Sequence, residues 1–269
     1  MFQFARVRKR MKVVLIGSGR LAWSLGPAMT EAGHSVLAVW SRSRASAEPL
    51  GRTLHAPWET AVENLPRHAD LYVIAVSDSG VKDVAGKLYV PENALCVHTA
   101  GSLPMSLLAP AAECYGVFYP MQTFSKERRV DFKDVPCFLE ASSPEAMTRL
   151  REFAGSLSSK VYELTGEGRS RLHVAAVFAC NFANHCYALA DELLKTTNLP
   201  FDLLVPLIDE TAVKVHGLSP LTAQTGPAVR GDEAVMAMHR KALADFPEAL
   251  RLYKMMSDDI VRMKKDSEQ

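Results

Sequence analysis

Hydrophobic positions divide the chain into two parts with different periods. In the first part, short runs that are apolar at nearly every position alternate with segments of helical spacing. Such runs indicate strands buried on both faces, and their alternation with helices indicates a parallel sheet covered on both sides. The predicted strands are 12–19, 35–41, 69–78, 94–102, 116–120, 136–141 and 160–164, and the first predicted helix is 21–33.

From about residue 165 onward the strand pattern ends and the spacing is helical. Predicted helices cover 168–196, 202–216, 233–245 and 247–265, and a long polar loop lies within 219–239. Within the predicted helix 168–196, residues 171–194 contain no Gly or Pro and are apolar almost all round, which is typical of a buried helix. We therefore predict an α/β domain with a doubly wound parallel sheet over 11–164 and a helical domain over 165–269. Residues 1–10 are expected to be a mobile extension, because MKVVLIGSG at Met11 looks like a natural start.

Composition narrows the function classes. The 269 residues are 48% hydrophobic and 23% charged, with a formal net charge of +1, so the chain offers no broad surface for nucleic acid. No apolar run reaches the roughly 18 residues that span a membrane, and no signal peptide is recognised. The five cysteines form no CxxC pair, which suits free thiols in a cytoplasmic protein.

A glycine-rich turn follows the first strand. In GSGRLA, Gly17 permits a tight turn, Gly19 allows a pyrophosphate to approach, and Ala22 permits close packing of the next helix. The helix N-terminus adds free N–H groups and a partial positive charge. A plain strand-to-helix turn and the glycine loop of a methyltransferase are the alternatives. The predicted cofactor contacts in this turn are Gly17, Ser18, Gly19, Arg20 and Leu21.

The end of the second strand predicts NADP as the cofactor. NAD sites usually carry an acidic residue there, whereas this chain has Ser41, Arg42 and Ser43 followed by Arg44. A guanidinium can pair with a 2′-phosphate, and the serine hydroxyls can add hydrogen bonds. The alternative is that both arginines lie in water at the start of a helix.

These segments resemble the superfamily of β-hydroxyacid dehydrogenases, pyrroline-5-carboxylate reductases and deazaflavin-dependent NADP oxidoreductases. HTAGSLPMSLL, GVFYPMQTFSK, RLHVAAVFACNFANH and TGPAVRGD resemble a narrower family that joins a Rossmann-like domain to a helical domain of unknown function. The resemblance covers residues 12 to about 262 and implies an all-α C-terminal dimerisation domain. It implies no substrate. The hydroxyacid dehydrogenases have a lysine on their interdomain helix, whereas His173 is the nearest polar candidate here, so their substrates cannot be carried across.

Polar groups follow three predicted strands, at the edge where ligands of parallel sheets bind. Similar proteins place the nicotinamide and its ribose along these segments. The resulting cofactor candidates are Val76, Ser77, Thr99, Ala100 and Gly101. Ser102 and Gln122 are substrate candidates, although turn chemistry explains Gln122 about as well. His98 lies in the body of a strand and is interpreted as a core histidine.

The long helix supplies the catalytic candidates. At about 100° per residue, His173, Asn181 and Asn184 share one arc of a helix expected to be buried. In proteins of this layout that helix faces the nicotinamide, so His173 is predicted to be a general acid or base, and the two asparagines are predicted to hold substrate. The alternative is a set of core hydrogen bonds.

The polar loop adds Thr225 and Arg230 as substrate candidates, with dimer contacts as the alternative, and Asp232 as a helix N-cap. No metal-binding spacing is present. The sequence thus predicts an NADP-dependent oxidoreductase acting on a small carbonyl, imine or alcohol between two domains, and a homodimer joined through the apolar C-terminal helices. The rivals are a non-catalytic NADP-binding sensor or interaction protein and a deazaflavin-linked NADP reductase.

Overall fold

The computed structural model describes residues 10–268, so the extension expected at 1–10 lies, apart from Arg10, outside the described residues. The chain forms two compact units that divide between Cys180 and Asn181. The division falls later than the change of pattern near residue 164, because the long helix that begins at Gly166 stays with the first unit for several turns.

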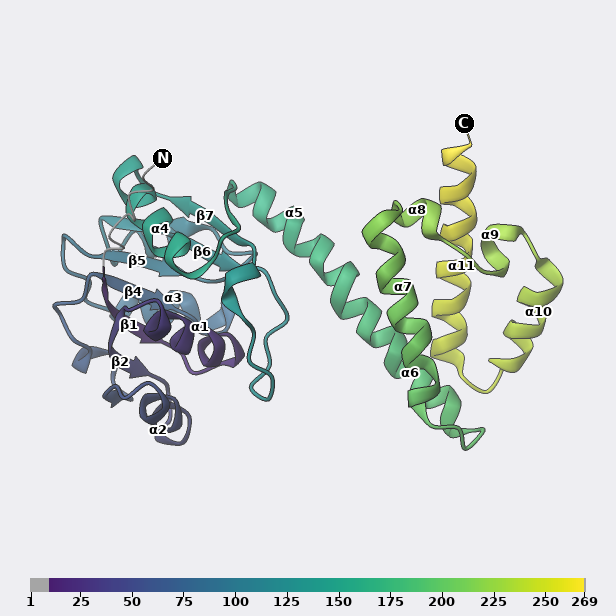
Figure 1. Ribbon diagram of the computed structural model, residues 1–269, viewed down its shortest axis with the longest axis horizontal. Helices are drawn as coiled ribbons and strands as arrows, with labels where there is room; N and C mark the ends of the chain where they lie inside the picture. Colours follow the sequence, from purple (N-terminus) through teal and green to yellow (C-terminus); the bar gives the residue numbers. More distant parts are fainter. Residues whose placement is uncertain (1–9, 269) are drawn as a thin grey trace, which may run out of the picture. The chain divides into compact units, whose positions relative to one another are not determined.

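The first unit is an eight-stranded sheet in the order β3-β2-β1-β4-β5-β6-β7-β8 (Figure 1). The strands are β1 Lys12–Ile16, β2 Ser35–Trp40, β3 Trp58–Glu59, β4 Leu71–Ile74, β5 Leu95–His98, β6 Cys114–Pro120, β7 Cys137–Ala141 and β8 Val161–Glu163. The chain order reverses beside β1, which places the carboxyl ends of β1 and β4 next to each other, as in doubly wound folds.

The predicted parallel sheet is confirmed for most of the strands, and the structure adds two details. One is β3, a two-residue strand that is too short to show a pattern in the sequence. The other is the direction of β7, which runs antiparallel to β6. A parallel return generally needs a long crossover, usually an α-helix, and between these strands the described chain has only the 3₁₀ turn Phe132–Asp134.

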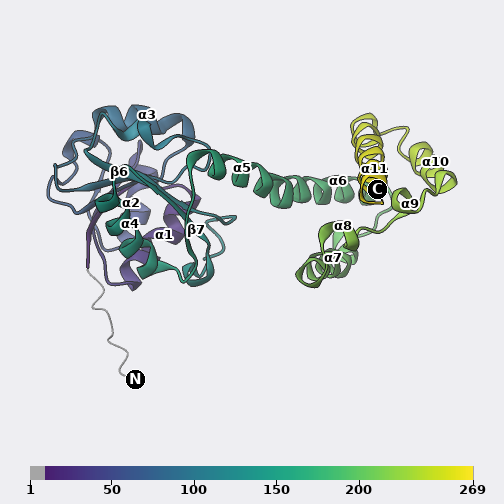
Figure 2. The ribbon, with the colours of Figure 1, turned by 90° about the horizontal axis from the view of Figure 1, so that it is seen from above.

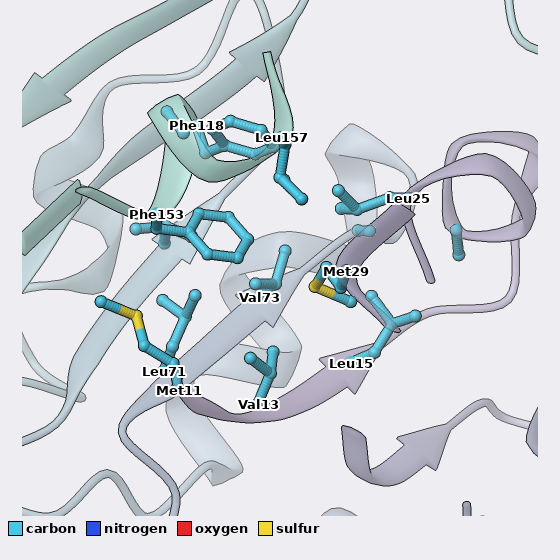
Figure 3. Packing of buried hydrophobic residues seen from close by; sticks show 14 of the residues in the cluster. Met11, Val13, Leu15, Leu25, Met29, Leu71, Val73, Phe118, Phe153 and Leu157 are labelled. Carbon is cyan, nitrogen blue, oxygen red and sulfur yellow. The ribbon is translucent and has the colours of Figure 1, made fainter. Parts of the chain in front are cut away.

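Helices cover both faces of the sheet. Successive residues of β1 point to opposite sides, so Val13 and Leu15 join one hydrophobic cluster while Val14 and Ile16 join the other. Figure 3 shows the first cluster, where α1 (Arg20–Glu31) supplies Leu25 and Met29. The same face receives α2 (Arg44–Thr53) and α4 (Pro144–Leu157), and the opposite face receives α3 (Asp78–Lys87) (Figure 2). Burial on both faces explains the continuous apolar runs.

The long helix is continuous but not uniform. It consists of α5 (Gly166–Ala176), a π-helical segment (Val177–Phe182) and α6 (Ala183–Lys195). A π turn holds more residues than an α turn and therefore advances each by less than about 100°. The arc computed for Asn181 and Asn184 relative to His173 was therefore wrong.

The second unit is helical. After α6 come the 3₁₀ turn Phe201–Leu204, α7 (Val205–Gly217), α8 (Pro220–Ala223), α9 (Pro227–Arg230), α10 (Glu233–Ala242) and α11 (Pro247–Ser267). The expected polar loop 219–239 in fact contains α8 and α9, each a single turn. Asp232 caps α10 as predicted, because its Oδ1 accepts a hydrogen bond from the Val235 N–H at 3.2 Å.

The expectation of a buried long helix was also wrong for the single chain. The side chain of Val174 is 54% exposed, and Asn181 and Asn184 are exposed as well. Large apolar side chains are also exposed on α7, where Leu207 is 63% exposed. A helix that is apolar on all sides usually needs another surface to cover it. In the single chain, the described residues leave much of this helix exposed. No helix within residues 10–268 is long and apolar enough to cross a membrane.

Candidate cofactor cleft

The glycine turn after β1 combines two different backbone requirements. Gly17 has φ +125°, and a Cβ on it would lie 2.2 Å from the carbonyl oxygen of Ala75, which follows β4. Gly19 precedes α1, and a Cβ on it would meet nothing nearer than that same oxygen at 3.9 Å. Gly17 is thus needed for strand packing, whereas Gly19 borders open space. No side chain caps α1, so its first N–H groups remain available for an anion.

Arg42 and Arg44 have different surroundings at the end of β2. The Nε of Arg44 donates to Glu48 at 2.8 Å, and its guanidinium lies over the ring of Trp58, 5.2 Å from the centroid. Arg42 is exposed and has no ion pair within the described chain. The Ser18 hydroxyl donates to Ser41 at 2.9 Å, which ties the glycine turn to the end of β2. Arg42 is therefore the arginine that is available for a phosphate.

One cleft of about 1020 Å³, formed entirely by the first unit, runs past these groups. Every predicted cofactor residue except Ser43 lines it: Gly17, Ser18, Gly19, Arg20, Leu21, Ser41, Arg42, Val76, Ser77, Thr99, Ala100 and Gly101. Ser43 lies before α2, and its hydroxyl donates to Ser46, which does line the cleft. Ser46, Thr60 and Asp78 also line the cleft, and the sequence analysis gave them no role.

At the far end of the cleft from Arg42 lie Tyr119, at the end of β6, and His173 on α5. The Tyr119 hydroxyl and the His173 Nδ1 are 3.0 Å apart. Gly101 packs against both, and a Cβ on it would lie 2.8 Å from that Nδ1 and 3.0 Å from the Tyr119 Cζ. A phenol and an imidazole thus form a hydrogen-bonded pair at the wall of the cleft. The sequence analysis gave no role to Tyr119.

The surroundings keep the phenol protonated. Burial raises the pKa of Tyr119, the nearby Asp78 carboxylate raises it further, and Arg169 offsets part of the change. Asp78 begins α3 and accepts a hydrogen bond from the Ser102 hydroxyl at 2.8 Å. With its proton retained, Tyr119 can donate to the Nδ1 of a neutral His173, whose single ring N–H is then on Nε2.

His98 is a core histidine, as predicted. It is fully buried, and burial, with a smaller effect of Arg169, lowers its pKa to about 4. The neutral ring accepts a hydrogen bond from the Ala100 N–H at 3.2 Å and lies 3.4 Å from the Pro104 carbonyl oxygen. His98 thereby supports the loop that carries Gly101.

Arg169, which the sequence analysis missed, lies beneath this wall and is 1% exposed. Its Nη1 donates to Glu140 on β7, and its Nη2 donates to the Leu103 carbonyl oxygen at 2.6 Å. Arg169 precedes His173 by one helical turn, and that spacing was the available signal.

The remaining candidates do not line the cleft. Ser102 bonds to Asp78, and the Gln122 side chain accepts a hydrogen bond from the Thr123 N–H at 2.8 Å, as turn chemistry suggested. Asn181, Asn184, Thr225 and Arg230 belong to the second unit, where all four are exposed, and their roles stay predictions. Residues 10–268 contain no cluster of His, Cys, Asp or Glu that could hold a metal ion.

A parallel-dominant sheet with a glycine turn before the first helix and a cleft at its switch point defines a Rossmann-like, dinucleotide-binding class of protein. Family models agree: a Rossmann-like domain matches residues 4–120, and the domain of unknown function DUF2520 matches residues 135–260. The chain belongs to the family that combines these two domains.

Solved structures with the same fold include several reductases. A Bacteroides fragilis protein, provisionally named an NADP oxidoreductase, is 48% identical with a TM-score of 0.90, over 94% of this chain and 98% of its own. A reductive aminase from Aspergillus terreus, in complex with NADPH and ethyl-5-oxohexanoate, is 16% identical with a TM-score of 0.71 over 95% of each chain. A pyrroline-5-carboxylate reductase from Streptococcus pyogenes is 13% identical with a TM-score of 0.63, over 94% of this chain and 99% of its own. No curated protein matches the chain.

Proposed function

We propose that this protein is an NADP-dependent oxidoreductase that moves hydride between the nicotinamide and a small carbonyl, imine or alcohol. The observation that carries the proposal is a single cleft lined by the glycine turn, by Arg42 and by the hydrogen-bonded Tyr119–His173 pair. The name of the 48% identical relative, provisionally an NADP oxidoreductase, supports the same class. A sensor needs the nucleotide site but has no need of a paired proton donor at the reacting end.

Different residues along the cleft would hold different parts of the cofactor and the substrate. The α1 N-terminus and the turn from Gly17 to Leu21 would hold the pyrophosphate, and Ser41 and Arg42 would hold the 2′-phosphate. Bound NADP supplies or accepts the hydride. His173 would exchange a proton with the substrate heteroatom, and Tyr119 would hold the imidazole in one tautomer. Ser102, Gln122, Asn181, Asn184, Thr225 and Arg230 remain the proposed substrate contacts.

Activity is tested without knowledge of the substrate. Ligands retained by the purified protein are identified by mass spectrometry, and NADPH oxidation is followed over a panel of carbonyls and imines, with and without deazaflavin. Turnover of a carbonyl or imine supports the proposal. NADPH binding without any turnover favours a sensor, and turnover only with deazaflavin favours a deazaflavin-linked reductase.

Arg42→Ala should weaken NADPH binding by about 10–100-fold, which corresponds to about 1.5–3 kcal/mol for a charge-assisted phosphate contact. NADH binding should hardly change, since NADH lacks the 2′-phosphate. Calorimetry with both cofactors measures this. Arg52→Ala is the matched control, because Arg52 is exposed and donates to Glu48 at 2.6 Å instead of lining the cleft. Equal affinities of the unaltered protein for NADPH and NADH would refute the NADP assignment.

We also propose a homodimer joined through the helices of residues 165–269, in the cytoplasm, where the five free thiols would persist. Leu203, Leu207 and Val213 are each more than half exposed, and an apolar surface of this extent marks an interface. Leu207→Asp should therefore shift the protein toward a 29.6 kDa monomer in light scattering. Lys214→Ala on the same helix should leave the mass unchanged. A stable monomer of the unaltered protein in dilute solution contradicts the dimer.

A further inference from the structure

We propose that Arg169, held by Glu140, is the positioning residue that sets the orientation of His173 relative to Tyr119 and Gly101. The inference rests on the proposed role of His173 in the cleft. It concerns a residue that itself does not line the cleft.

The first observation is the burial of the guanidinium. Arg169 has a side chain 1% exposed, while its partner Glu140 is 21% exposed. Placing a charged group inside a protein costs several kcal/mol, and an apolar residue of similar volume often stabilises a fold equally well. If α5 needed only to be packed against the sheet, a leucine at position 169 would be sufficient. Unlike leucine, the planar fork of the arginine guanidinium also fixes the direction of the side chain, because its two terminal nitrogens donate to two separate acceptors.

The second observation is which segments the fork connects. Glu140 lies on β7, and Leu103 lies on the loop that follows β5. The other oxygen of Glu140, Oε1, accepts a hydrogen bond from the Gly166 N–H at 3.0 Å, at the start of α5. Thus one ion pair fixes both the beginning of α5 and a point one turn further on. These two anchoring points oppose both sliding of α5 along its axis and rotation about it.

The third observation is where this rotation matters. His173 follows Arg169 by four residues, so both side chains leave α5 on nearly the same face. The loop held through Leu103 also carries Gly101, and the imidazole lies so close to Gly101 that a Cβ there would be 2.8 Å from the Nδ1. Arg169 therefore fixes both the helix that carries His173 and the loop against which the imidazole packs. Loss of the fork should leave the Tyr119–His173 hydrogen bond without defined geometry.

The test is ¹⁵N NMR of the histidines in the full-length protein at neutral pH. In the unaltered protein, His173 should show one tautomer, with Nδ1 as the acceptor from Tyr119. Tyr119→Phe defines the signal when that bond is absent. Arg169→Lys keeps the charge but loses the fork, and Glu140→Gln keeps an acceptor for Gly166 but removes the carboxylate. Both should move the His173 signals most of the way to those of Tyr119→Phe.

Two controls separate positioning from general loosening. Arg171→Lys alters an ion pair with Glu167 on the same helix, where both side chains are exposed, and it should leave His173 unchanged. The second control is His239 on α10, whose Nδ1 lies 3.0 Å from the Tyr253 hydroxyl, and its signals should be unchanged in every variant. If Arg169→Lys and Glu140→Gln lower the melting temperature but leave the His173 tautomer intact, Arg169 only stabilises the fold and the inference is overturned.

The outcome is independent of whether the enzyme proposal holds. If His173 loses its single tautomer in both Arg169→Lys and Glu140→Gln, the positioning role of Arg169 is supported even if no substrate is ever turned over. Once a substrate is found, Arg169→Lys should lower kcat by about 10²-fold, as expected for a misplaced reacting group, with little effect on NADPH binding. An unchanged kcat together with a large effect of His173→Ala would leave the enzyme proposal standing and overturn the role of Arg169.

Discussion

Replacing His173 by alanine should lower turnover by about 10²–10⁴-fold, the usual contribution of general acid–base catalysis, while NADPH stays bound. The imidazole lies at the end of the cleft opposite Arg42 and bonds to Tyr119, so its removal takes away a proton-transfer group but no phosphate contact. Because Tyr119 keeps its proton, the remaining phenol replaces the imidazole poorly as a base.

Turnover, cofactor affinity and melting temperature should be measured together on His173→Ala. His68→Ala is the matched control, since His68 is exposed on the same unit and lies outside the cleft. A structural histidine would give a different result, namely a lower melting temperature with unchanged turnover per folded molecule. That outcome would end the catalytic assignment of His173 and leave the cofactor site unaffected.

Gly19→Val should leave the protein folded and abolish dinucleotide binding, by at least about 10²-fold in affinity, because the side chain would occupy the space of the pyrophosphate. The backbone of Gly19 is extended, at φ −72° and ψ −178°, which valine adopts readily, and its Cβ would meet no near neighbour. Titration of NADPH and NADH, with a melting curve for each variant, measures both parts of this prediction.

Gly17→Ala is the informative companion, since it should destabilise the fold by about 2–5 kcal/mol through backbone strain and overpacking. Its φ of +125° disfavours any side chain, and the new Cβ would lie 2.2 Å from the Ala75 carbonyl oxygen. Two glycines two positions apart should therefore fail in opposite ways, one in binding and one in folding. If Gly19→Val binds NADPH normally, the turn is a plain connection between strand and helix.

Much of the first unit could be predicted because its information is local. Strands such as β1 are buried on both faces, and they can therefore be recognised as runs of consecutive apolar residues. The glycine turn and the end of β2 follow from the same register, and so all predicted cofactor residues but Ser43 line one cleft. The antiparallel β7 was not predictable in this way, since a strand has the same pattern in either direction.

The candidate catalytic end was only half predictable. The family resemblance pointed to His173, but its partner Tyr119 lies 54 residues away in the chain and on a different element. The π-helical segment also changes the angular positions of Asn181 and Asn184 relative to His173 from those of a uniform α-helix. A helical wheel assumes a uniform turn, and a departure from it depends on packing beyond the helix itself.

The sequence by itself determined the alternation of strands and helices, the glycine turn after β1, the absence of an acidic residue after β2 and the apolar character of the C-terminal helices. Each of these can be read from residues that are close together in the chain, as continuous apolar runs, a short motif or helical spacing. Only the tertiary structure decided that Arg42 and not Arg44 is available, that Tyr119 bonds to His173, and that Arg169 connects Glu140 with Leu103. These facts depend on contacts between distant segments, as with Arg169 and Leu103, which are 66 residues apart, and no local pattern encodes which buried polar groups will meet.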